Sequence, residues 1–119
     1  MSLFDTTQLS LEAAMRGSSL RQTLLTDNLA NVNTPGYQRK DVDFHSALAS
    51  ALQTGDAAQV EDVSFSPTVE SSRVVRADGS GIDPDQESAE LAKNALEYES
   101  LVQVAGARTQ ILQIAMGVR

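Results

Sequence analysis

Residues 83–119 decide the fold, and they read DPDQESAELAKNALEYESLVQVAGARTQILQIAMGVR. Asp83 is a favourable N-cap residue, Pro84 suits the first helical position, and the carboxylates of Asp85 and Glu87 complement the positive end of a helix dipole. This start predicts one helix of about 33 residues, which at about 1.5 Å per residue would be roughly 50 Å long. A compact domain of this chain length does not need such a helix. The segment therefore predicts an elongated molecule.

Two apolar stripes run along this predicted helix. One follows heptad steps of four and three with a single polar member, Thr109, and its apolar members are Leu91, Ala95, Tyr98, Val102, Ala105, Leu112 and Met116. The other stripe contains Leu101, Val104, Ile111, Ala115 and Val118. A heptad stripe predicts pairing with a second long helix as a coiled coil. Because pairing hides only one face, the second stripe is expected to contact other subunits.

A second long helix is predicted near the N-terminus. Asp5 and Gln8 have the spacing of a capping box, and Pro35 disfavours helical geometry in the residue before it, so we expect the helix to end near Asn33. Its main stripe, which Ser18 and Gln22 interrupt, contains Leu11, Met15, Leu25, Leu29 and Val32. A neighbouring stripe contains Leu9, Ala13, Leu20 and Leu24. Gly17 inside this helix costs about 1 kcal/mol relative to alanine.

The middle of the chain is acidic and irregular. Of the 16 acidic residues, 11 fall between Asp41 and Glu90, where Arg73 and Arg76 are the basic residues. A short helix is predicted from the apolar residues Phe44, Leu48, Ala51 and Leu52. Alternation with polar neighbours favours a small β-hairpin on Val63, Phe65 and Val69, followed by Val74 and Val75.

The sequence therefore predicts a mainly α, elongated subunit. Its long N- and C-terminal helices pair as a coiled coil and are joined by an irregular middle with the short helix and the small hairpin. We divide it into an N-terminal helix with its turn (1–36), the acidic middle (37–81) and a C-terminal helix (82–119), which together form one structural unit.

Composition limits the classes of function. The chain has 119 residues, 41% of them hydrophobic, with only three Phe, two Tyr and no Trp, so it has little from which to build a large core. We expect a partner surface to complete its hydrophobic contacts. A net charge of −7 argues against binding to nucleic acid, and the absence of Cys excludes disulfides. We expect no membrane span and no cleaved signal peptide, so export would need another route.

The sequence contains little that predicts chemistry. His45 is the only histidine, and although Ser46 and Asp43 adjoin it, consecutive residues on a helix point in different directions. Asp83, Asp85 and Glu87 have the spacing of the first three ligands of a calcium-binding loop. Ser88, however, occupies the position at which that loop requires glycine. We predict no catalytic residue, cofactor, metal or small-molecule substrate, and no enzymatic activity.

The end of the first helix carries a recognisable motif. Residues 27–37, Asp-Asn-Leu-Ala-Asn-Val-Asn-Thr-Pro-Gly-Tyr, resemble the N-terminal signature of the bacterial flagellar rod and hook proteins. Its matching residues are Asn28, Ala30, Asn31, Thr34, Pro35, Gly36 and Tyr37. The continuation through Asp41 and Phe44 and the stretch Glu90-Leu91-Ala92-Lys93-Asn94-Ala95-Leu96-Glu97-Tyr98 are similar to the FlgB proximal rod proteins. The related FlgC proteins usually lack the Lys-Asn-x-Leu-x-Tyr form.

The resemblance implies a non-enzymatic structural subunit of the flagellar rod, the shaft of the basal body that transmits torque. Such proteins pass unfolded through the flagellar type III export channel and polymerise through their terminal helices. The implied partners are other copies of the chain, the rod proteins FlgC and FlgF, and the FliE adaptor with the MS ring and export gate. The middle is short for this family.

Individual residues of the motif have physical roles beside this resemblance. Pro35 and Gly36 are expected to fix the exit of the chain from the first helix, and Asn28 and Asn31 to hydrogen-bond nearby backbone. Tyr37 and Phe44 would anchor the following segment on the helices.

A second reading is an adaptor or chaperone-like module. It would dock a partner helix in the groove between its own two helices, fold alone and not polymerise.

Overall fold

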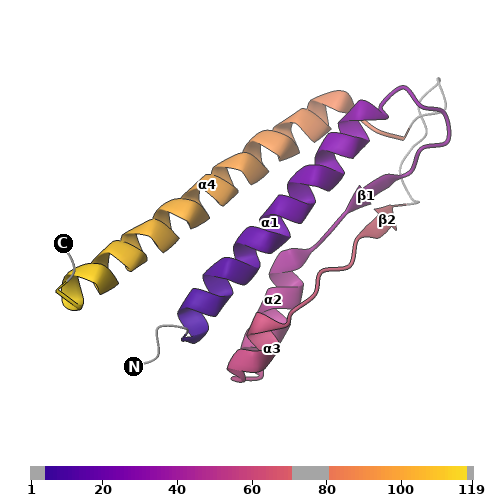
Figure 1. The fold of residues 1–119 in the computed structure, drawn as a ribbon. Coiled ribbons are helices and arrows are strands. Elements are labelled where there is room, and N and C mark those ends of the chain that lie inside the picture. The colour runs from indigo at the N-terminus through magenta and orange to yellow at the C-terminus, as the bar shows by residue number, and fades with distance from the viewer. Residues whose placement is uncertain (1–4, 71–80, 118–119) are drawn as a thin grey trace.

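The computed structural model describes residues 5–70 and 81–117, and it is built mainly of helices. Two long helices, α1 (Thr6–Ala30) and α4 (Pro84–Ala115), lie side by side (Figure 1). Between them in sequence come the strand β1 (Arg39–Asp41), the helices α2 (Phe44–Gln53) and α3 (Ala57–Glu61), and the strand β2 (Thr68–Glu70). This confirms the predicted elongated, mainly α fold with a short middle helix and a small antiparallel pair.

The elements form a single layer. Helix α1 lies in the middle, with α4 along one side and α2, α3 and the strands along the other (Figure 1). The molecule is flat, with extents of 62 × 31 × 14 Å along its principal axes. Its radius of gyration is 17.8 Å, whereas a compact domain of this length would have about 13.5 Å. Domains normally bury a core between at least two layers, so this layer leaves broad faces uncovered.

The helix starts follow the predicted capping residues. The Asp5 side chain accepts a hydrogen bond from the Gln8 backbone N–H at 3.0 Å, and Asp83 accepts one from the Asp85 N–H at 3.0 Å. The return bond of the predicted capping box does not form, because the Gln8 amide donates to Glu12 instead. Helix α1 ends at Ala30, earlier than the predicted end near Asn33.

The small sheet joins two distant segments. Strands β1 and β2 run antiparallel, and Lys40 pairs with Val69 at the centre of the register. Val69 therefore lies in a strand as predicted, but its partner strand comes from residues 39–41 rather than from the neighbouring Val74 and Val75, which lie outside the described residues. The sequence did not indicate β1, because Arg-Lys-Asp has no apolar alternation.

The middle elements pack on α1 through a small core. Leu9 of α1, Ala51 of α2 and Val60 of α3 form one buried cluster. Phe44, at the start of α2, is buried against Gly17, where a Cβ atom would lie 2.6 Å from the Phe44 Cβ. Gly17 is therefore present because Phe44 approaches the α1 backbone too closely for any side chain.

Candidate functional site

The contact between α1 and α4 has heptad spacing. Of the buried and half-buried positions of α4, those at 87, 91, 94, 101, 105, 108 and 112 follow heptad steps, and we call this line the seam; the others are 84, 90 and 97. The predicted stripe instead placed Ala95, Val102 and Thr109 in the contact. In the structure these three residues are exposed, and the residue before each of them lies in the seam instead: Asn94, Leu101 and Arg108. Two of the three are polar, so a stripe built from apolar residues alone missed them.

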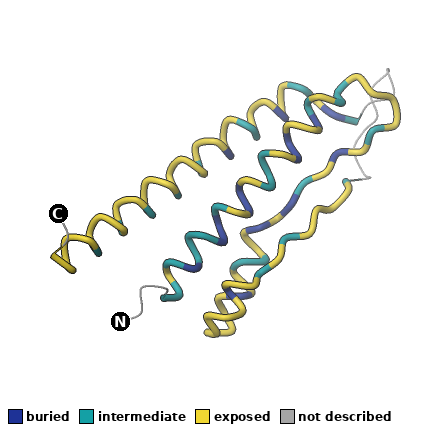
Figure 2. The backbone as a smooth tube through the Cα atoms, in the orientation of Figure 1, coloured by how far each residue is buried: buried dark blue, intermediate teal, exposed yellow. Residues whose placement is uncertain are grey.

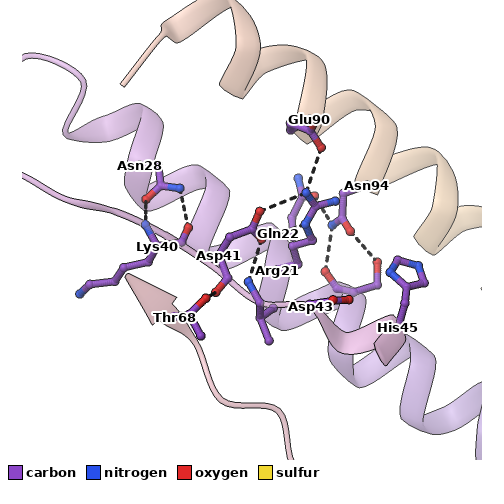
Figure 3. A network of polar contacts seen from close by, with 12 residues as sticks. Arg21, Gln22, Asn28, Lys40, Asp41, Asp43, His45, Thr68, Glu90 and Asn94 are labelled. Atoms are coloured by element: carbon purple, nitrogen blue, oxygen red, sulfur yellow. Dashed lines mark hydrogen bonds and ion pairs between the residues drawn. The ribbon is translucent and has the colours of Figure 1, made fainter. Parts of the chain in front are cut away.

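A polar layer explains how Asn94 can lie in the seam. Its side-chain amide donates to the Ser18 carbonyl at 2.9 Å and to the Gln22 side chain at 2.8 Å (Figure 3). Ser18 Oγ in turn donates to Asn94 Oδ1 at 3.2 Å. Ser18 and Gln22 are the two residues that interrupt the stripe of the first helix, and Asn94 binds both. A buried polar layer of this kind fixes the register of two paired helices, because a shifted pairing would leave its groups unsatisfied.

The far end of the seam closes with an ion pair. Arg108 Nη2 lies 2.6 Å from Asp5 Oδ2, so the residue that caps α1 also holds α4. The hydrogen bond from the Gln8 N–H, followed by the charge of Arg108, lowers the pKa of Asp5 despite the opposing effect of desolvation.

The signature motif builds the turn that ends α1. Asn31 caps the helix, and its side-chain amide donates to the Asp27 carbonyl at 2.8 Å. Thr34 then opens a tight turn in which the Tyr37 N–H donates to the Thr34 carbonyl at 3.2 Å. Gly36 has a φ of 76°, a conformation that favours glycine, and Pro35 suits the position before it. Partial burial and the nearby carboxylate of Asp27 raise the pKa of the Tyr37 hydroxyl.

Asn28 ties this helix to the strand that follows the turn. Its side chain is fully buried and acts as a partner strand would: Nδ2 donates to the Lys40 carbonyl at 2.7 Å, and Oδ1 accepts from the Lys40 N–H at 3.0 Å (Figure 3). The predicted hydrogen bonding of Asn28 and Asn31 to nearby backbone is thus seen at both residues.

An ion network joins α1, both strands and α4. Arg21 of α1 contacts Asp41 at 2.9 Å and Glu90 at 2.9 Å (Figure 3). Arg39 of β1 is buried and pairs with the fully buried Glu87 of α4, and also with Glu70 and Asp41 at 2.9 Å and 3.1 Å. Losing one member of such a buried set would leave a charge uncompensated, which is strongly destabilising.

The arginines set the charge of Asp41. Burial alone would raise the pKa of Asp41, but the hydrogen bond from Arg21, the Val42 N–H and the charge of Arg39 outweigh burial and lower it. The same hydrogen bond, opposed by burial, raises the pKa of Arg21. Asp41 therefore stays ionised and holds β1 between the two guanidinium groups.

The expected site residues are of two kinds: the signature residues with their continuation, and the helix-packing residues. Of the signature residues and their continuation, Asn28 and Phe44 are buried and Asn31, Tyr37 and Asp41 half-buried, whereas those at the surface are Ala30, Thr34, Pro35 and Gly36. Of the expected packing residues, Leu25 is buried, and the half-buried ones are Leu11, Met15, Leu29, Leu91, Leu101 and Leu112. The exposed ones are Ala95, Tyr98, Val102, Val104 and Ile111.

The second half of α4 is mostly exposed (Figure 2), and several of its exposed residues are large and hydrophobic. Among the described residues, nine large hydrophobic residues are highly exposed and seven of them lie from Leu96 to Met116; Ile111 and Ile114 are 65% and 68% exposed. Exposed apolar surface of this extent marks an interaction site. Over the described residues, no helix combines the length and the apolar character needed to cross a membrane.

The residues that suggested a catalytic arrangement point to other partners. Ser46 Oγ donates to Asp43 at 2.6 Å within the first turn of α2, whereas the ring of the exposed His45 pairs with Glu97 of α4. Among residues 5–70 and 81–117, no group of three or more acidic or histidine side chains could hold a metal ion.

Comparison with known proteins agrees with this architecture. The family described as "Flagella basal body rod protein" matches residues 10–38, which cover most of α1 and the signature turn. The flagellar basal body rod protein FlgB of Bacillus subtilis is 33% identical, over 87% of this chain and 87% of its own length. The chain belongs to the FlgB family of flagellar basal body rod proteins. The FlgB proteins of Escherichia coli and Salmonella typhimurium are 33% and 32% identical, over 74% and 82% of the chain and 76% and 83% of their own lengths.

This FlgB-family chain is a structural subunit of the rod in the bacterial flagellar basal body. The names of these relatives describe rod proteins, so they give no support to the alternative reading as an adaptor or chaperone.

Several residues that organise the site were not identified from the sequence. These are Arg21, Arg39 and Arg108, together with the packing role of Asn94 and the buried ion pair of Glu87, which was expected only to complement the dipole of α4. A signal existed for two of them, because Asn94 and Arg108 continue the heptad spacing through Leu91, Leu101 and Leu112. The partners of Arg21 and Arg39 come from three other elements, and no local pattern reveals them.

Proposed function

We propose that the chain polymerises through its terminal helices to form the proximal part of the rod and there transmits torque without catalysing a reaction. The supporting observation is a flat molecule whose α4 exposes apolar residues along its second half. Exposure of this apolar surface to water is unfavourable in free energy, and contact with neighbouring subunits would bury the surface.

The exposed face of the signature turn is proposed to contribute to assembly. Thr34, Pro35 and Gly36 form an exposed, hydrogen-bonded turn at one end of α1, while Asn28 and Asp41 are occupied inside the molecule. A preformed turn loses little conformational entropy on binding, which favours tight contact with a neighbour.

Export in an unfolded state through the flagellar type III channel forms part of the proposal. The apolar core is small: its larger buried side chains are Leu9, Leu24, Leu25, Val42, Phe44, Val60 and Ile82. The chain has no Cys that could lock it by a disulfide. A small core without covalent cross-links costs little to unfold before transport. The proposed neighbours are further copies of the chain, FlgC, FlgF, and FliE with the MS ring and export gate.

Ile111→Asp tests the assembly role of α4. Ile111 is 65% exposed, so a carboxylate at this position should leave the isolated fold intact while placing a charge in a subunit contact. We expect loss of motility in cells that carry the variant as their only copy, and its absence from purified basal bodies. Gln59→Asp, at an exposed position of α3, is the matched control and should support normal swimming.

The same substitution at Ile114 provides a second site on the same face. Circular dichroism of each purified variant would establish that its helix content equals that of the parent chain. Normal swimming with both Ile111→Asp and Ile114→Asp would contradict the proposal that this face of α4 packs against neighbours.

A further inference from the structure

Helix α4 extends beyond the helix that supports it. Arg108 pairs with Asp5, the cap of α1, and α4 continues from residue 108 to residue 115, about 10 Å past this ion pair. Val104, Ala107, Ile111 and Ile114 follow steps of three, four and three, so they share one face of α4; we call them the outer stripe. All four are exposed, and Arg108, turned to Asp5, is the single charged residue between 101 and 115.

A shallow groove lies on the uncovered surface between α1 and α4. It consists of two adjoining hollows of 610 and 380 Å³ that share Ser19 of α1 and Tyr98 of α4. The larger hollow extends along α1 from Glu12 to Thr23 and is lined mainly by small or apolar side chains. Its charged lining residues, Glu12 and Arg16, have opposite signs and add no net charge.

We propose that the outer stripe of one copy docks into this groove on a second copy. The proposal rests on the proposed function, and it names the two surfaces that meet and the direction in which subunits join. The stripe spans eleven residues of helix, about 15 Å from first to last, and the groove follows twelve residues of α1, about 16 Å from first to last, so their lengths are compatible. A short apolar helix face laid in a groove between two helices is a common mode of recognition.

Charge decides which surfaces of two copies of this chain can meet. With a net charge of −7, two copies repel each other across most of their surfaces. The outer stripe carries no charge and the groove no net charge, so these two surfaces can meet without burying an unpaired ion.

The two surfaces differ, and both belong to the same chain. Each copy that offers its stripe to one neighbour therefore still has a free groove for another. Such a heterologous contact does not pair two copies back to back and can continue in one direction as an open assembly.

The absence of Cys from the chain allows a direct test. The double variant Ser19→Cys with Ile111→Cys is made as the full chain, and basal bodies assembled in cells are oxidised mildly. A disulfide within one copy is excluded by distance: Arg108 lies beside Asp5, and Ser19 lies about 20 Å further along α1, whereas bridged Cα atoms are about 4.4–6.8 Å apart.

We expect a ladder of dimers, trimers and longer products from the double variant. Each single variant can give at most a dimer, and Gln59→Cys with Ile111→Cys, which moves the first thiol to exposed α3, should give no ladder. Equal ladders from both pairs would overturn the proposal. So would the lack of a ladder from the first pair, or a cross-link from position 19 to a different rod protein without one between copies.

Swimming in the absence of oxidant separates this proposal from the function it rests on. If cells swim with the double variant but no ladder forms, α4 can still serve in assembly, but the groove is not the site at which the outer stripe binds. Cells that also swim normally with Ile111→Asp would refute both.

Discussion

Replacing Gly17 by alanine should destabilise the fold, although alanine is the better helix former. A Cβ built at Gly17 lies 2.6 Å from both Cβ and Cγ of Phe44 and 2.8 Å from its Cδ2. Carbon atoms in contact are normally about 3.5–4.0 Å apart, so the Phe44 side chain would have to move by about 1 Å. Phe44 is 1% exposed and its Cβ is fixed to the start of α2, so the shift would displace the helix.

The expected magnitude follows from two opposing effects. Overpacking of a buried site costs about 1–3 kcal/mol, and the gain in helix propensity from glycine to alanine is about 1 kcal/mol. The net change in the free energy of unfolding is therefore a loss of up to about 2 kcal/mol. Gly106→Ala in α4 is the matched control, because no atom lies within 4 Å of its Cβ position. It should gain about 1 kcal/mol, or about 4 °C in Tm.

Thermal and urea unfolding followed by circular dichroism would measure both variants under identical conditions. Hydrogen exchange would add the location, since amides of α2 should lose protection in Gly17→Ala and keep it in Gly106→Ala. If Gly17→Ala raised the midpoint as Gly106→Ala does, Phe44 would not pack against Gly17, and the account of how the middle segment attaches to α1 would be wrong.

Three further changes test the polar contacts. Asn94→Ala should lower the free energy of unfolding in urea by about 1–3 kcal/mol, because the Ser18 carbonyl and Gln22 lose their partner. Asn94→Gln should recover part of this loss. Equal stability of both variants and the parent chain would exclude the polar layer. The folded pKa of Asp41 is lowered, so its contribution to stability is present above the unfolded pKa of about 3.9 and is lost as the pH falls through the folded pKa. Asp41→Asn should therefore flatten the acid side of a stability profile, and an unchanged slope between about pH 4 and pH 2 would argue against the ion network. Arg108→Ala should fray the start of α1 and lower the helicity, which circular dichroism and hydrogen exchange of residues 6–12 would detect. Unaltered protection of these residues would show that the Arg108–Asp5 pair does not hold the start of α1.

The parts of the fold that depend on local signals could be predicted from the sequence. Asp83 and Pro84 mark the start of α4, and Pro35 with Gly36 marks the turn after α1, because capping and turn geometry depend on neighbouring residues. The signature residues also identified the family that the comparisons show.

The register of the two long helices was beyond such local reasoning. Apolar residues occupy several faces of α4, so more than one seam satisfies the hydrophobic pattern. The choice depends on Asn94 meeting Ser18 and Gln22 some 70 residues away in sequence, and on Arg108 meeting Asp5. Strand β1 is a similar case, because the side chain of Asn28 and the strand β2 hold it in place rather than any preference of its own residues.

Hydrogen exchange on residues 101–115, compared between the monomer and the assembled rod, tests the central claim most directly. We expect these amides to exchange faster than those of residues 9–28 in the monomer, and to become strongly protected after assembly, while residues 9–28 exchange slowly in both states. Full protection of residues 101–115 in a monodisperse monomer, with no change on assembly, would contradict the claim that neighbouring subunits complete this helix.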